Sequence, residues 1–222
     1  MGVKERFALL SEKVEIAAQN SGRKRSDITI IAVSKYASLC QMEESYRAGI
    51  RIFGESRLQV ALAKQKTVSW KEEVFWHFVG PIQSNKALSI GASCSCLHSI
   101  SSVKIAKKLS DYGLTRGEKV SCFLEVNILK DALKQGFFAE EIERLQEELF
   151  TLEGLQILGL MTMGPHTKKT EEMRQCFRAV AALRQHLPKT ASFLSMGMSG
   201  DFSVAIEEGA THIRIGSYLY GE

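Results

Sequence analysis

A lysine at the end of a predicted buried strand is the first residue of this sequence that could carry chemistry. Residues 28–35 read Ile-Thr-Ile-Ile-Ala-Val-Ser-Lys, and a run of β-branched and small apolar residues is typical of a buried strand. A lysine amine held in a pocket there would lose hydration, which favours its neutral, nucleophilic form. Lys35 is therefore a candidate for a Schiff base with an aldehyde. The alternative is an ammonium group that reaches solvent at the strand end.

Two glycine-containing turns could bind a phosphate group. Ser199-Gly200-Asp201 follows one predicted strand and opens a predicted helix, and the unpaired N–H groups of a helix N-terminus attract anions. Gly216-Ser217 follows the last predicted strand and adds a backbone amide and a hydroxyl. Either turn alone could be an ordinary helix cap or loop. Together, after the last two strands of a barrel, they occupy the usual phosphate position.

The composition excludes several classes of protein. The net charge of +4 is not gathered into long basic runs, so we predict no nucleic-acid partner, although a weakly basic balance suits a phosphorylated ligand. Five cysteines without framework spacing fit a reducing cytosol and predict a cytoplasmic protein. Cys94-Ser95-Cys96 has no second Cys/His pair of matching spacing, so we predict no metal. The charged N-terminus predicts neither a signal peptide nor a membrane span.

Eight strands are predicted, and a helical pattern follows most of them. The predicted strands are residues 28–35, 51–54, 74–79, 94–100, 119–127, 155–161, 192–195 and 212–215. The predicted helices are residues 4–20, 38–49, 55–66, 84–90, 101–112, 139–150, 169–186 and 199–208. Eight β/α units in 222 residues predict the α/β class and a (β/α)8 TIM barrel. A doubly wound sheet is the alternative.

Polar and glycine residues gather at the predicted carboxyl ends of these strands, where TIM barrels place their functional groups. The residues at or just after those ends include Lys35, Glu55, His77, Asn85, Asn127, Met161, Ser195 and Arg214. His77 could equally be a packed strand residue. The pattern predicts a single functional rim.

Seven short motifs, in order along nearly the whole chain, carry a family resemblance. They are Ala32-Val33-Ser34-Lys35, Phe53-Gly54-Glu55, Trp76-His77-Phe78-Val79-Gly80, Gln83-Ser84-Asn85-Lys86, Gly159-Leu160-Met161, Leu194-Ser195-Met196-Gly197-Met198-Ser199 and Arg214-Ile215-Gly216. With these motifs the sequence resembles the pyridoxal phosphate homeostasis proteins, single-domain relatives of the N-terminal barrel of alanine racemase. Ser56 departs from the family's usual asparagine and offers a shorter hydrogen-bonding arm.

The resemblance implies one barrel domain over residues 1–222, similar to the alanine racemase N-terminal domain, that binds pyridoxal 5′-phosphate. By that likeness Lys35 forms the imine with the cofactor aldehyde, and Arg214 lies toward the pyridine nitrogen. An arginine only donates hydrogen bonds, so it leaves that nitrogen unprotonated and the ring a weaker electron sink. The remaining cofactor-binding positions implied by the likeness are His77, Asn85, Met161, Ser199, Gly200, Gly216 and Ser217.

The implied function is to hold the cofactor and to buffer or deliver it inside the cell, as a monomer that serves apo-enzymes, with no catalytic residue. One alternative is a pyridoxal-phosphate enzyme that acts on amino acids, in the manner of a racemase. Another is a cofactor-free lyase in which Lys35 attacks a sugar phosphate. Racemases take their second base, a tyrosine, from a second domain of the partner subunit. This sequence ends shortly after Gly216, so we expect no racemase activity.

Overall fold

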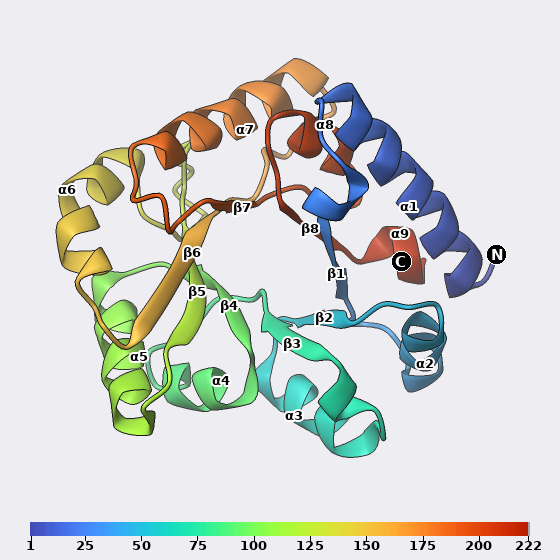
Figure 1. Ribbon diagram of the computed structural model, residues 1–222, viewed down its shortest axis with the longest axis horizontal. Helices are drawn as coiled ribbons and strands as arrows, with labels where there is room; N and C mark the ends of the chain where they lie inside the picture. The colour runs from blue at the N-terminus through green and yellow to red at the C-terminus, as the bar shows by residue number, and fades with distance from the viewer. Residues whose placement is uncertain (222) are drawn as a thin grey trace.

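Eight parallel strands pair in chain order, and the last pairs with the first to close a barrel (Figure 1). The computed structural model describes residues 1–221, so residue 222 of the predicted domain lies outside the described residues. The strands are β1 Thr29–Val33, β2 Ile52–Glu55, β3 Phe75–Phe78, β4 Cys96–Ile100, β5 Val120–Glu125, β6 Leu155–Met161, β7 Phe193–Ser195 and β8 His212–Ile215. The predicted (β/α)8 barrel is confirmed. The doubly wound alternative is wrong, because such a sheet is open.

Helices surround the barrel on its outside (Figure 1). The helices are α1 Val3–Asn20, α2 Leu39–Arg47, α3 Leu58–Thr67, α4 Ala87–Ser93, α5 Val103–Arg116, α6 Ala139–Phe150, α7 Thr170–Gln185, α8 Phe202–Glu207 and α9 Ser217–Tyr220, with short 3-10 turns at Arg25–Asp27 and Lys71–Glu73. No helix of residues 1–221 is long and apolar enough to cross a membrane.

Alternating side chains of the strands build two separate apolar regions. Leu97 of β4 and Leu124 of β5 belong to the large core cluster that packs against the helices. Cys96 and Phe123, their neighbours in sequence, pack with Met161 in a small separate cluster. Because successive side chains of a strand point to opposite faces, this small cluster lies inside the barrel. Much of the rest of the interior is polar, and it supplies part of the candidate site.

Three helices begin one turn later than the sequence predicts. Helix α3 begins at Leu58, α4 at Ala87 and α8 at Phe202, whereas the predicted starts were residues 55, 84 and 199. The skipped residues form the loops that follow β2, β3 and β7 on the carboxyl rim of the barrel. Helix α5 begins at Val103 rather than at residue 101 as predicted, and Ser102 is its N-cap, because the Ser102 hydroxyl accepts a hydrogen bond from the backbone N–H of Ile105, at 3.4 Å.

Candidate functional site

Lys35 lies on the carboxyl rim, in the turn that follows β1. The strand ends at Val33 rather than at Lys35 as predicted, and the fully buried Ser34 separates the two. Lys35 itself is half-buried, and its Nζ lies 4.7 Å from the centre of the exposed Tyr36 ring. Among residues 1–221 it forms none of the ion pairs of this structure. Its amine is therefore unpaired and reachable, and it is less buried than a deep pocket would make it.

A second lysine near the same strand end is engaged in an ion pair. Glu55, at the end of β2, is 1 % exposed, and its Oε1 lies 2.7 Å from Lys64 Nζ and 2.7 Å from the Ser34 hydroxyl, which both donate to it. Lys64 also donates to the backbone carbonyl of Ser34. Glu55 therefore fixes Ser34, the residue just before Lys35, and pairs with the charge of Lys64. Of the two lysines near the end of β1, Lys35 is the one whose amine is available.

The two predicted phosphate turns lie side by side. The Ser199 hydroxyl accepts a hydrogen bond of 3.1 Å from the backbone N–H of Tyr218, in the first turn of α9. Gly200 is exposed, and a Cβ atom at this position would meet nothing within 4 Å, so the space in front of the turn is open. The Ser199 N-cap alternative is wrong, because Asp201 occupies the N-cap position of α8.

Gly216 lies between these two turns and the end of β1, which Lys35 follows. It occupies the N-cap position of α9, and a Cβ atom there would lie 3.3 Å from the carbonyl oxygen of Val33, the last residue of β1. The pairing of Ala32 with Ile215 between β1 and β8 fixes this neighbourhood. The lysine turn and the phosphate turns therefore share one side of the carboxyl rim.

A chain of hydrogen bonds crosses the barrel interior from β8 to β3. Arg214 Nη1 donates to the Ser195 carbonyl at 2.7 Å and to the Ser195 hydroxyl at 2.8 Å, and Nη2 donates to the Thr162 carbonyl at 2.8 Å. His98 Nδ1 lies 2.8 Å from the same hydroxyl, and His98 Nε2 lies 2.9 Å from His77 Nδ1. The structure thus joins His77 and Arg214, two predicted site residues, through Ser195 and His98.

Burial sets the charges along this chain. Burial lowers the pKa of Arg214 to about 10, against the opposing effect of the nearby carboxylates Asp201 and Glu125, so the guanidinium stays charged at neutral pH. Burial lowers the pKa of His77 to about 3 and holds that of His98 well below its ordinary value. Both histidines are therefore neutral, and Arg214 is the charged end of the chain.

Sequence reasoning overlooked His98 and did not single out Ser195 for a role of its own. The available signal was the spacing of Cys96 and His98, which places both on one face of β4, although Cys94-Ser95-Cys96 by itself is equally typical of strand packing. Donor atoms of His77, Cys96 and His98 lie within 4.8 Å of one another, a combination that suits transition metals. Two of these atoms are already hydrogen-bonded to each other, so the chain of hydrogen bonds accounts for them.

The remaining predicted positions differ in their surroundings. Met161 ends β6 and is 2 % exposed, packed against Cys96 and Phe123 inside the barrel. Ser217 is exposed at the first turn of α9. Asn85 is exposed in the turn before α4.

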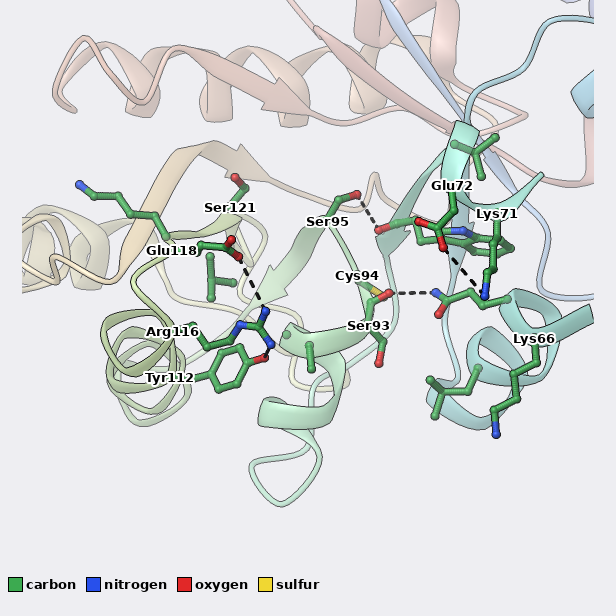
Figure 2. A pocket seen from close by; sticks show the side chains of 18 residues that line it. Lys66, Lys71, Glu72, Ser93, Cys94, Ser95, Tyr112, Arg116, Glu118 and Ser121 are labelled. Atoms are coloured by element: carbon green, nitrogen blue, oxygen red, sulfur yellow. Dashed lines mark hydrogen bonds and ion pairs between the residues drawn. The ribbon is translucent and has the colours of Figure 1, made fainter. Parts of the chain in front are cut away.

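A cavity of about 650 Å³ lies at the other end of the barrel (Figure 2). Side chains near the N-terminal ends of β3, β4 and β5 line it together with α3, α4 and α5. Figure 2 shows Lys71 turned toward Glu72 and Arg116 toward Glu118. The nitrogen–oxygen distances of these two ion pairs are 3.9 and 4.0 Å. None of the predicted site residues lines this cavity.

Comparison with known proteins decides the family. The alanine racemase N-terminal domain family matches residues 11–222. A pyridoxal phosphate homeostasis protein of Pseudomonas aeruginosa is 36% identical over 219 residues, which are 99% of this chain and 95% of the relative. One from Aquifex aeolicus is 32% identical over 226 residues, 100% of this chain and 99% of the relative. The chain belongs to the pyridoxal phosphate homeostasis protein family.

Solved structures agree with this assignment. PipY of Synechococcus elongatus, in a structure with PLP bound, is 32% identical, has a TM-score of 0.86, and matches over 99% of this chain and 100% of PipY. Alanine racemase of Bartonella henselae, in a structure with covalently bound pyridoxal phosphate, superimposes with a TM-score of 0.76 over 100% of this chain and 60% of the racemase. At 14% identity this second likeness shows the fold alone.

Proposed function

We propose that this protein holds pyridoxal 5′-phosphate on Lys35 and buffers or delivers it inside the cell without catalytic turnover. The observation that carries the proposal is the unpaired amine of Lys35 on the same side of the rim as two adjoining turns that suit a phosphate group. The full-length relatives named for pyridoxal phosphate homeostasis, and PipY with PLP bound, support the same cofactor.

The residues of the rim fit such a cofactor. Open space in front of Gly200 leaves room for a phosphate group at the turns of α8 and α9, where backbone N–H groups attract anions. Among residues 1–221, Arg214 uses three of the five N–H groups of its guanidinium, so two remain for a ligand. Once bound, the cofactor supplies an aldehyde, which an imine with Lys35 would mask, and an electron-withdrawing ring. His77, Asn85 and Met161 complete the proposed site.

Two features of the site support holding rather than turnover. Arg214 donates hydrogen bonds and accepts none, so it would leave a pyridine nitrogen unprotonated and the ring a weak electron sink. The two tyrosines that follow β8 are occupied, because Tyr220 is 8 % exposed with its hydroxyl 3.1 Å from that of Ser45, and Tyr218 packs edge-on against Phe202. Neither is placed as the second base that racemisation needs.

The proposal extends to the setting in which the protein works. We place it in the cytoplasm, where its five free cysteines stay reduced, with apo-enzymes that need the cofactor as its recipients. We propose a single cofactor-binding domain over residues 1–222 that acts as a monomer. The closed barrel supports this state, because closure removes the strand edges through which sheets associate.

Absorbance of the protein as isolated, followed by borohydride reduction and mass mapping, tests the holding role. We expect a visible band that reduction abolishes, with the cofactor mass on Lys35 and none on Lys64. A colourless protein that is trapped only with a sugar phosphate would overturn the proposal in favour of a lyase.

Proton NMR of L-alanine and D-alanine in deuterated buffer tests the absence of turnover. One missing acid–base group costs roughly 10²–10⁴-fold in rate, so we expect at most trace exchange at Cα with cofactor-loaded protein. Exchange with inversion at an enzymatic rate, lost in Lys35→Ala, would show a racemase instead.

A further inference from the structure

The hydrogen-bond chain behind Arg214 has a direction that its chemistry fixes. The guanidinium can only donate, so the Ser195 hydroxyl, 2.8 Å away, accepts from it. The hydroxyl proton then has His98 Nδ1, at 2.8 Å, as its acceptor. In the reverse arrangement the Ser195 hydroxyl would accept twice, and its own proton would have no other acceptor among residues 1–221.

The direction continues to the end of the chain. A neutral imidazole whose Nδ1 accepts carries its proton on Nε2, and His98 Nε2 therefore donates to His77 Nδ1, 2.9 Å away. By the same rule His77 carries its proton on Nε2. Every donor of the chain thus points away from Arg214, and both histidines have a defined tautomer.

We propose that Ser195 and His98 are positioning residues that, together with His77, hold the Arg214 guanidinium in one orientation through a one-way hydrogen-bond chain. The four side chains are at most 8 % exposed and come from β8, β7, β4 and β3, so the chain ties together distant parts of the barrel wall. Neither imidazole can accept a hydrogen bond from Arg214, because the lone pair on each His Nδ1 already accepts one within the chain. The guanidinium keeps its two remaining N–H groups for the ligand.

For the cofactor, this inference rests on the proposed function. The hydrogen bonds to Ser195 already fix the Arg214 guanidinium before the cofactor binds. No side-chain entropy is then lost in ordering it when the pyridine ring binds, which reduces the entropy cost of binding. It also presents only hydrogen-bond donors to the ring nitrogen and keeps its proton, because the guanidinium stays charged at neutral pH. The tautomers themselves belong to the protein alone and do not depend on which ligand binds.

Long-range ¹H–¹⁵N NMR of the histidine rings in cofactor-free protein tests the direction. We expect His98 and His77 as neutral rings with the proton on Nε2, and we expect the Nδ1 signal of His98 to move in Ser195→Ala as its hydrogen bond is lost. His212→Phe is the matched control, since His212 is an interior histidine whose Nδ1 bonds to Thr211 instead, and it should leave both tautomers unchanged. A proton on Nδ1 of His98 in the wild-type protein would overturn the inference, even if no variant folds.

Cofactor titration tests the positioning. Ser195→Ala and His98→Phe should shift the visible band of the bound cofactor and weaken its affinity by about tenfold, the size of one hydrogen bond to a charged group, whereas His212→Phe should do neither. If Ser195→Ala and His98→Phe both kept the wild-type absorbance band and the wild-type cofactor affinity, the positioning role would be wrong. If the wild-type protein bound no cofactor, the proposed function would be wrong. The NMR result would still decide the direction of the hydrogen-bond chain.

Discussion

The two ends of the barrel carry similar residue types but organise them differently. At the carboxyl rim, Arg214, Lys64 and Glu55 are buried or nearly so, and each is fixed by hydrogen bonds of 2.7 to 2.8 Å. Around the cavity at the opposite end, Lys71 and Arg116 form ion pairs of 3.9 and 4.0 Å whose side chains are about half exposed or more. Exposed pairs of this kind contribute little to stability. The cavity alone therefore does not indicate the proposed site, whereas the fixed buried charges and the open glycine turns support it.

The largest expected effect separates the two lysines of the carboxyl rim. Lys35→Ala should abolish the visible band of the bound cofactor and leave the free energy of unfolding nearly unchanged, because Lys35 forms no ion pair with any of residues 1–221. Lys64→Ala should lower the free energy of unfolding by about 3 kcal/mol, since it leaves the buried Glu55 carboxylate without its partner. Absorbance and urea denaturation measure the two effects. An unchanged band in Lys35→Ala would contradict the assignment of the lysine.

Gly200→Phe tests the phosphate turns. A Cβ atom at Gly200 meets nothing, so the fold should tolerate the change while the ring fills the space in front of the turn. We expect affinity for pyridoxal 5′-phosphate to fall by more than about tenfold, and affinity for non-phosphorylated pyridoxal to change little. Titration with both compounds measures this, and equal losses would place the phosphate elsewhere.

Acidification should weaken the fold through the histidines His77 and His212, whose rings lie in the barrel interior. Burial lowers the pKa of His77 to about 3 and that of His212 to about 4, whereas an unfolded histidine titrates near about 6.5. Between these pKa values the unfolded chain therefore binds protons that the folded chain does not. The free energy of unfolding is highest, with respect to these histidines, above about pH 6.5, and it decreases as the pH falls below that value. At about pH 5 each histidine should account for a loss of about 2 kcal/mol.

Urea denaturation at about pH 7 and pH 5 measures this loss. His77→Gln should remove the share of the pH dependence that comes from the lowered pKa of His77. Burial raises the pKa values of Glu125 and Asp201, which acts in the opposite direction but equally in the variant and in the wild-type protein. The same pH dependence in His77→Gln and in the wild-type protein would show that this ring is not held neutral.

The smallest expected effect is at the opposite end of the barrel. Charge reversal of both cationic partners there, Lys71→Glu with Arg116→Glu, should leave cofactor affinity unchanged and shift the free energy of unfolding by less than about 1 kcal/mol. Cofactor titration and denaturation of the double variant measure this. A loss of affinity would mean that the two ends of the barrel are coupled.

Much of the rim was predictable because its signals are local. Hydrophobic runs, the glycines that interrupt them and the alternation of strands and helices determine eight β/α units, and that count determines the barrel. Lys35, Gly200 and Gly216 then follow from one rule, namely that function lies where strands end. The helix starts were less predictable, because the same residues after β2, β3 and β7 could extend a helix or form a loop.

By itself the sequence determined the barrel and the residues of its rim, while the tertiary structure alone decided how their charges are arranged. His98 and Ser195 are 97 positions apart in the chain, and His77 and His98 are 21 apart, so no local pattern relates them. Closure of the barrel brings β3, β4, β7 and β8 around one interior, where burial makes the histidines neutral and requires Arg214 to be hydrogen-bonded. The same closure pairs Lys64 with Glu55 and leaves Lys35 available, since a buried carboxylate needs a charge partner and a residue on the open rim does not.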